Sequence, residues 1–111
     1  MYYNKVARSL GLRSSSIDDF YRLFLIPGME HCWGGPGAVR FGQTGREIPI
    51  PVNASTGRKP DNILLALVDW VEHGRAPETI MGQSEDGKST RVHCRYPQRS
   101  MWDGTEYICV S

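Results

Sequence analysis

Apolar residues recur at helical spacing in two stretches of the chain. The first stretch, residues 2–10, reads YYNKVARSL and is followed by Gly11, a residue type common just after a helix end. The second, residues 62–73, reads NILLALVDWVEH and lies between Asp61, a good N-cap residue, and Gly74. Because apolar residues cover most of the circumference of this second helix, we expect it to be packed on several sides.

Strand patterns occur at three places. The run 20–26, FYRLFLI, is apolar apart from one charge and is followed by Pro27–Gly28, which is typical of a buried strand in a parallel sheet. Residues 78–84 and 88–94 lie on either side of the turn sequence EDGK and predict a β-hairpin. Residues 107–110 predict a last strand in an otherwise irregular tail.

A strand, a glycine-rich loop and an apolar helix in this order indicate an α/β fold. A parallel sheet needs several strands with helices on both faces, whereas this chain supplies one such strand and two helices. We therefore predict that residues 1–111 form one incomplete domain. It would be the end of a mostly parallel, doubly wound sheet that begins outside this chain.

The charge balance and hydropathy exclude several classes of partner. Lys and Arg number 13 and Asp and Glu number 12, so the chain is nearly neutral. Its net charge therefore favours neither nucleic acid nor an anionic membrane as a partner. No apolar run approaches the roughly 18 residues that a membrane span requires. The start of the chain, MYYNK, lacks the basic-then-apolar pattern of a signal peptide. We expect neither a nucleic-acid partner nor a membrane partner.

His31 is the strongest candidate for chemistry. It lies in the glycine-rich loop MEHCWGGPG (29–37), shortly after the predicted strand, and α/β sheets form their sites at the carboxyl ends of strands. An imidazole there can take a proton from a serine and return it to the leaving group. In α/β-hydrolases the triad histidine also comes last, after the serine and the acid. The alternative is a surface or structural histidine.

Three further motifs are weaker candidates. Ser9, in the sequence ARSLG, matches the loose form of a nucleophile elbow, but it ends a helical pattern instead of following a strand. Trp33 is a candidate for substrate contact because it is close to His31, whereas Trp70 belongs to an apolar helix and is expected in the core. Asn53 begins an N-A-S glycosylation sequon.

The chain has three cysteines, so one has no cysteine partner within it. Cys94 and Cys109 enclose a loop of 16 residues, and a disulfide there would contribute about 3 kcal/mol. Cys32 could form a disulfide that holds the histidine loop, act as a thiol nucleophile, or be a buried thiol. A zinc site at His31–Cys32 and His93–Cys94 is disfavoured, because zinc motifs separate their ligands by two to four residues. No metal site is predicted.

Taken together, the sequence resembles the C-terminal part of the tannase and feruloyl esterase family. The likeness runs over nearly the whole chain, in four segments that occur in the family's order. These are YRLFLIPGMEHC (21–32) with the glycines that follow, LALVDWVE (65–72) with Gly74 and Pro77, TR at 90–91 with Cys94, Tyr96 and Pro97, and YIC (107–109).

The resemblance implies a secreted serine esterase with an α/β-hydrolase fold, a Ser–Asp–His triad and a calcium-binding lid. The esterase implied by the resemblance would act on aromatic esters, feruloyl or galloyl. On this basis His31 is the triad histidine, and His73 and His93 are dispensable. Cys94 and Cys109 form the family's C-terminal bridge, and Cys32 pairs with a cysteine outside this chain.

The segments expected to hold the serine, the aspartate, the oxyanion hole and the lid are absent from this sequence. We therefore expect a C-terminal fragment, without the lid and the N-terminal half, that binds no cofactor and is inactive alone. The alternative is a non-catalytic interaction domain, or an inactive truncated derivative of the esterase.

Overall fold

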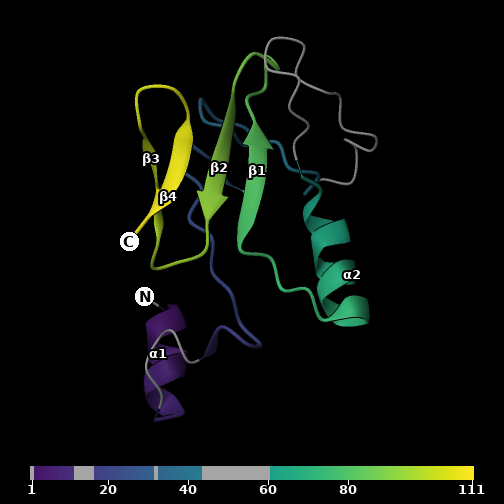
Figure 1. Ribbon diagram of the computed structural model, residues 1–111, viewed down its shortest axis with the longest axis vertical. Helices are drawn as coiled ribbons and strands as arrows, with labels where there is room; N and C mark the ends of the chain where they lie inside the picture. Colours follow the sequence, from purple (N-terminus) through teal and green to yellow (C-terminus); the bar gives the residue numbers. More distant parts are fainter. Residues whose placement is uncertain (1, 12–16, 32, 44–60) are drawn as a thin grey trace.

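The computed structural model describes residues 2–11, 17–31, 33–43 and 61–111 (Figure 1). Its helices and strands are α1 (Tyr2–Ser9), α2 (Ile63–His73), β1 (Thr79–Gln83), β2 (Thr90–Cys94), β3 (Arg99–Trp102) and β4 (Tyr107–Val110). The strands form two antiparallel hairpins, β1 with β2 and β3 with β4. The second hairpin lies beside β2, and α2 lies on the β1 side of the first (Figure 1).

The hairpin predicted at 78–94 is confirmed. Ile80 of β1 faces His93 of β2, and the turn between the strands is closed by polar contacts. Asp86 accepts hydrogen bonds from the Ser84 hydroxyl at 2.6 Å and from the Lys88 N–H at 2.9 Å, and Gly87 has φ 73°. This turn is therefore specified locally, by residues that a short window of sequence contains.

The last strand at 107–110 is also confirmed, but the tail before it is not irregular. β3 pairs with β4, and the rings of Trp102 and Tyr107 meet edge to face with centroids 5.2 Å apart. The Asp103 carboxylate accepts from the N–H groups of Thr105 and Glu106, both at 2.7 Å, and so closes the turn. Such cross-strand aromatic pairs stabilise a hairpin whose strands show little alternation of apolar and polar residues.

Helix α2 forms where the apolar spacing predicts it and ends at Gly74, which has φ 69°. Its N-cap is Asn62 and not Asp61. The Asn62 side-chain oxygen accepts from the N–H groups of Leu64 and Leu65 at 3.0 and 3.1 Å. Asp61 instead accepts from the Met81 N–H at 2.7 Å, which ties the start of the helix to β1.

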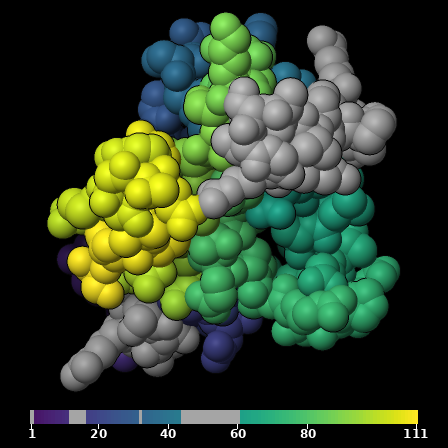
Figure 2. Space-filling view, turned by 45° about the horizontal axis from the view of Figure 1, so that its top comes forward, coloured from purple at the N-terminus to yellow at the C-terminus, as the bar shows by residue number. Residues whose placement is uncertain are grey.

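The expected packing of α2 on several sides is absent among the described residues. None of its residues is buried, and Leu65 and Val71 are 61% and 77% exposed. An apolar groove of about 540 Å³ lies along it, lined by α2 residues together with Phe24, Pro77 and Ile80, and a hollow beside the helix is visible in Figure 2. Neither helix of the described parts is long and apolar enough to cross a membrane.

The prediction of a buried parallel strand at 20–26 is wrong. This segment makes a single antiparallel bridge, between Phe24 and Arg95, supported by the Tyr96 N–H donating to the Leu23 carbonyl at 2.8 Å. Phe20 and Leu25 are 60% and 53% exposed. An apolar run forms a central strand only where strands flank both of its edges. In the described part of the chain, this run forms a β-bridge on one edge only, with Arg95 just after β2.

Candidate functional site

His31 lies in a loop whose backbone doubles back on itself. The Glu30 N–H donates to the Gly34 carbonyl at 3.0 Å, and the Gly37 N–H donates to the Gly28 carbonyl at 3.4 Å. A Cβ atom on Gly35 would lie 2.1 Å from the Gly28 oxygen. Only glycine permits this approach, so the glycines determine the path of the loop.

The loop presents its side chains outward. His31 is exposed, and Trp33 is 66% exposed. Both can therefore be reached from outside the described part of the chain, by a substrate or by other residues. Two candidates, Cys32 and Asn53, lie outside the described residues.

The segment leading to this loop is held by a polar network that the sequence did not reveal. Asp18 is buried and accepts from the Tyr3 hydroxyl of α1 and from the Arg95 guanidinium. Arg95 also pairs with Glu78 at 3.0 Å, and Arg22 donates to the other oxygen of Glu78 at 2.9 Å. The two arginines hold the pKa of the Glu78 carboxyl below its usual range. The network thus joins α1, the segment before the loop and the ends of β1 and β2.

A second group of contacts holds the far side of the loop. Arg40 and Gln83 exchange two backbone hydrogen bonds of 2.9 Å, which attach the chain after the loop to β1. The Ala38 carbonyl lies 2.7 Å from Nε2 of His93 on β2. Ala38 and Phe41 are buried in the same region. The histidine loop is therefore anchored before and after its glycine turns.

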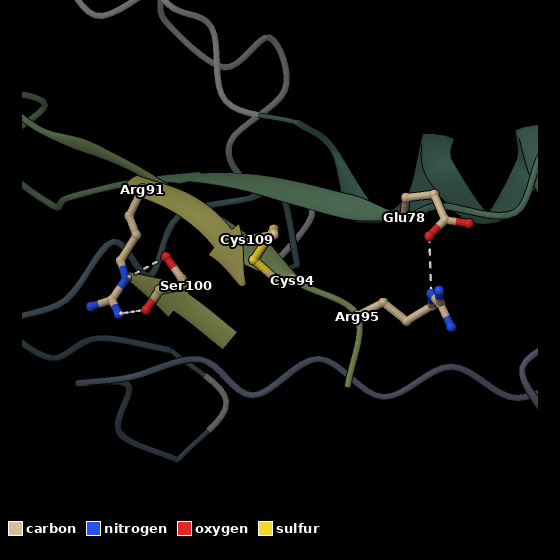
Figure 3. The surroundings of a disulfide bond; sticks show 6 residues. All are labelled: Glu78, Arg91, Cys94, Arg95, Ser100 and Cys109. Atoms are coloured by element: carbon tan, nitrogen blue, oxygen red, sulfur yellow. Dashed lines mark hydrogen bonds and ion pairs between the residues drawn. A yellow bond between two sulfur atoms is a disulfide. The ribbon is translucent and has the colours of Figure 1, made fainter. Parts of the chain in front are cut away.

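The two hairpins are joined to each other by a disulfide and by side-chain hydrogen bonds (Figure 3). Cys94 of β2 and Cys109 of β4 form a disulfide with Cα atoms 5.7 Å apart. Arg91 donates to the hydroxyl and to the carbonyl of Ser100, both at 3.0 Å, and its guanidinium lies 4.3 Å from the centre of the Tyr107 ring. Because Cys94 is disulfide-bonded, it cannot serve as the zinc thiolate that was considered as an alternative.

Ser9 does not have the setting of a nucleophile. It is the last residue of α1 and is exposed, and no strand precedes it in the described residues 2–9. A nucleophile elbow places its serine between a strand and a helix. The structure therefore agrees with the sequence argument against Ser9.

The stability of the protein at alkaline pH tests the polar network around Asp18, because Tyr3 belongs to that network. Burial and the hydrogen bond to the Asp18 carboxylate raise the pKa of Tyr3 from 10.0 to about 12. The unfolded chain then loses this proton at lower pH than the folded chain, so the stability that Tyr3 contributes is complete below pH 10 and is lost as the pH rises toward 12.

We expect Tyr3→Phe to lower the free energy of unfolding at neutral pH by about 1.5 kcal/mol and to flatten its decline above pH 10. Denaturant unfolding at a series of pH values measures both effects. The matched control is Tyr2→Phe, because Tyr2 is on the same helix and is 71% exposed. Identical pH profiles for wild type and Tyr3→Phe would contradict the prediction.

Known proteins share this arrangement. The family model described as "Tannase and feruloyl esterase" matches residues 1–111. The chain belongs to the tannase and feruloyl esterase family. The resemblance in the sequence is thereby confirmed.

Members of the family with similar sequences come from fungi. The chain is 43% identical over 111 residues to probable feruloyl esterase B-2 of Aspergillus fumigatus, a match that covers 94% of this chain and 20% of the relative. The corresponding protein of Aspergillus flavus is 47% identical over 104 residues, with 86% of this chain and 19% of the relative covered. The chain spans about a fifth of the length of these relatives.

A solved member of the family has a similar structure. The crystal structure of feruloyl esterase B from Aspergillus oryzae matches with a TM-score of 0.78 and 37% sequence identity. The match covers 98% of this chain and 22% of that structure. The two helices and two antiparallel hairpins therefore have a counterpart within a larger feruloyl esterase.

Proposed function

We propose that this chain is the C-terminal part of a secreted carboxylic ester hydrolase of the feruloyl esterase and tannase type, with an α/β-hydrolase fold in the complete enzyme. His31 is its triad histidine, and the serine and the aspartate come from segments outside this chain. The observation that carries the proposal is the family match over all 111 residues, together with an exposed His31 on a loop anchored at both ends.

The chemistry follows from the position of this imidazole. The serine hydroxyl attacks the ester carbonyl while His31 takes its proton, and His31 then protonates the departing alcohol. Water hydrolyses the acyl-enzyme in the second half, again with His31 as the base. An anchored loop restricts the backbone that carries the imidazole through both halves, which lowers the entropic cost of each proton transfer.

Aromatic esters are the substrates that we propose. The similar proteins are named feruloyl esterases, and the family name adds tannase, so the acyl group is feruloyl or galloyl. Trp33 is exposed close to His31 and offers a flat apolar surface for an aromatic acyl ring.

The remaining assignments belong to the complete enzyme. Cys32 pairs with a cysteine next to the serine, and Asn53 carries a glycan. The described residues contain no group of three or more metal-ligating side chains. From the family resemblance we assign the calcium ion to the lid, outside this chain, and no step above depends on it.

The test is ester hydrolysis by the full-length protein that carries this chain. We expect hydrolysis of methyl ferulate or methyl gallate by that protein, and none by residues 1–111 alone. Failure of the full-length protein to hydrolyse either ester would contradict the proposal. Hydrolysis by residues 1–111 that is abolished by Ser9→Ala would assign the nucleophile to Ser9 instead.

A non-catalytic interaction domain is the second candidate. The exposed leucines of α2 and the adjacent groove favour an interaction domain. A contiguous exposed apolar surface usually contacts another protein or another part of the same protein. In the first proposal the rest of the esterase covers this surface. A His31→Ala variant distinguishes the two, since only an enzyme depends on that imidazole for turnover.

A further inference from the structure

His93 is a fully buried histidine that the proposed reaction does not use. Its Nε2 atom lies 2.7 Å from the carbonyl oxygen of Ala38, and 55 positions in the sequence separate the two residues. A carbonyl oxygen only accepts, so Nε2 carries the proton and donates it. Burial lowers the pKa of His93, which favours the neutral ring. The other ring nitrogen, Nδ1, has no hydrogen-bond partner among the described residues.

The backbone around Ala38 is shaped to receive this bond. A Cβ atom on Gly82 of β1 would lie 2.2 Å from the Ala38 oxygen and 2.7 Å from Nε2 of His93. Any side chain at position 82 would occupy the space in which the Ala38 carbonyl meets the His93 ring. This contact therefore requires glycine there. The ring also meets Phe41 edge to face, with centroids 6.2 Å apart. His93 is therefore held in place as well as bonded.

The Ala38 carbonyl that accepts from His93 lies directly after the loop that carries His31. Gly37 precedes Ala38 and donates to the Gly28 carbonyl at 3.4 Å, while a Cβ atom on Gly37 would lie 2.1 Å from the Pro27 oxygen. The chain from Pro27 to Gly37 is closed in this way, and His31 lies within it. Moving the Ala38 carbonyl would move Gly37, and with it the base of the loop.

We propose that His93 is a positioning residue for His31, acting through the hydrogen bond from its Nε2–H to the Ala38 carbonyl. The proposal rests on the proposed function, because it presumes that His31 is the catalytic base. It revises the expectation from sequence that His93 is dispensable. A small displacement of a catalytic group costs mainly turnover, so kcat falls while KM changes little.

The experiment compares two replacements of His93 in the full-length protein with methyl ferulate as substrate. His93→Phe keeps a ring but has no donor, whereas His93→Gln keeps an N–H donor. We expect His93→Phe to lower kcat at least about tenfold with KM within about twofold of wild type. His93→Gln is expected to retain at least about half of the wild-type kcat.

Two further variants separate positioning from general stability. Ile80→Val removes one methylene group opposite His93 in the register, and we expect a lower midpoint of unfolding with unchanged kcat. Gly82→Ala keeps the His93 side chain, but its methyl group would overlap the Ala38 oxygen and crowd Nε2 of His93, which breaks the hydrogen bond, and we expect the kcat loss of His93→Phe. If His93→Phe does not fold, Gly82→Ala and His93→Gln decide the question.

The outcomes separate this proposal from the proposed function. Folded His93→Phe with wild-type kcat, in a protein that His31→Ala inactivates, would overturn the role of His93 alone. Equal losses in His93→Gln and His93→Phe would also overturn it, because the donor would then not matter. A full-length protein that hydrolyses neither methyl ferulate nor methyl gallate would overturn the proposed function, and the role of His93 with it.

Discussion

Replacing His31 with alanine in the full-length protein should lower kcat for methyl ferulate by at least about a thousandfold. Without the imidazole, the serine hydroxyl keeps its proton as it attacks, and the leaving alcohol receives none. KM should change little, because the role proposed for His31 is on the reacting atoms. Steady-state kinetics on variants with matched unfolding midpoints measure the effect.

His73→Ala is the matched control for this experiment. His73 is exposed at the end of α2, where its Nδ1 lies 3.1 Å from the Asp69 carboxylate. We expect its kcat to remain within about twofold of wild type. If His31→Ala keeps about a tenth of the wild-type rate or more, the assignment of His31 as the general base is wrong.

Replacing both Cys94 and Cys109 with serine should lower the free energy of unfolding by about 3 kcal/mol. The bond spans 15 positions, and closing a loop of that length removes conformational entropy from the unfolded chain. Besides the disulfide, the Arg91–Ser100 bonds also join the first hairpin to the second, and they remain in the variant. Denaturant unfolding under oxidising conditions measures the loss.

The control for the cysteine variant is the wild-type protein with a thiol reductant. Reduction should remove the difference in stability between wild type and the double variant, because the bond proposed for Cys32 is broken equally in both. Mass spectrometry of an unreduced digest should find the Cys94 peptide joined to the Cys109 peptide. A peptide joining Cys32 to either of them, or equal stability with and without the bond, would contradict the prediction.

Elements that depend on neighbouring residues could be predicted from the sequence. The ends of α2 are set by Asn62 and Gly74, and the first turn by Asp86 and Gly87, all within a few positions of the element they bound. The N-cap was predicted one residue too early because Asp61 and Asn62 are both good caps. Only the contact of Asp61 with β1 distinguishes them.

Elements that depend on distant partners could not be predicted. The run 20–26 is apolar enough for a buried strand, but the sequence does not specify which strands lie beside it. In the same way, local signals pointed to His31 as a candidate but not to the contacts that anchor its loop. Asp18 and Arg95 are 77 positions apart, and Ala38 and His93 are 55 apart, so neither pair appears in any local pattern.

The glycine contacts of the loop that carries His31 also limit how this protein could be redesigned. At Gly35 and Gly37 a methyl group would overlap a backbone oxygen, which a neighbouring side chain cannot relieve by rotating. Libraries that randomise the loop uniformly would therefore consist mostly of misfolded members. Under the proposed function, diversity aimed at new acyl groups belongs at Trp33, whose exposed ring can be exchanged without changing the path of the backbone.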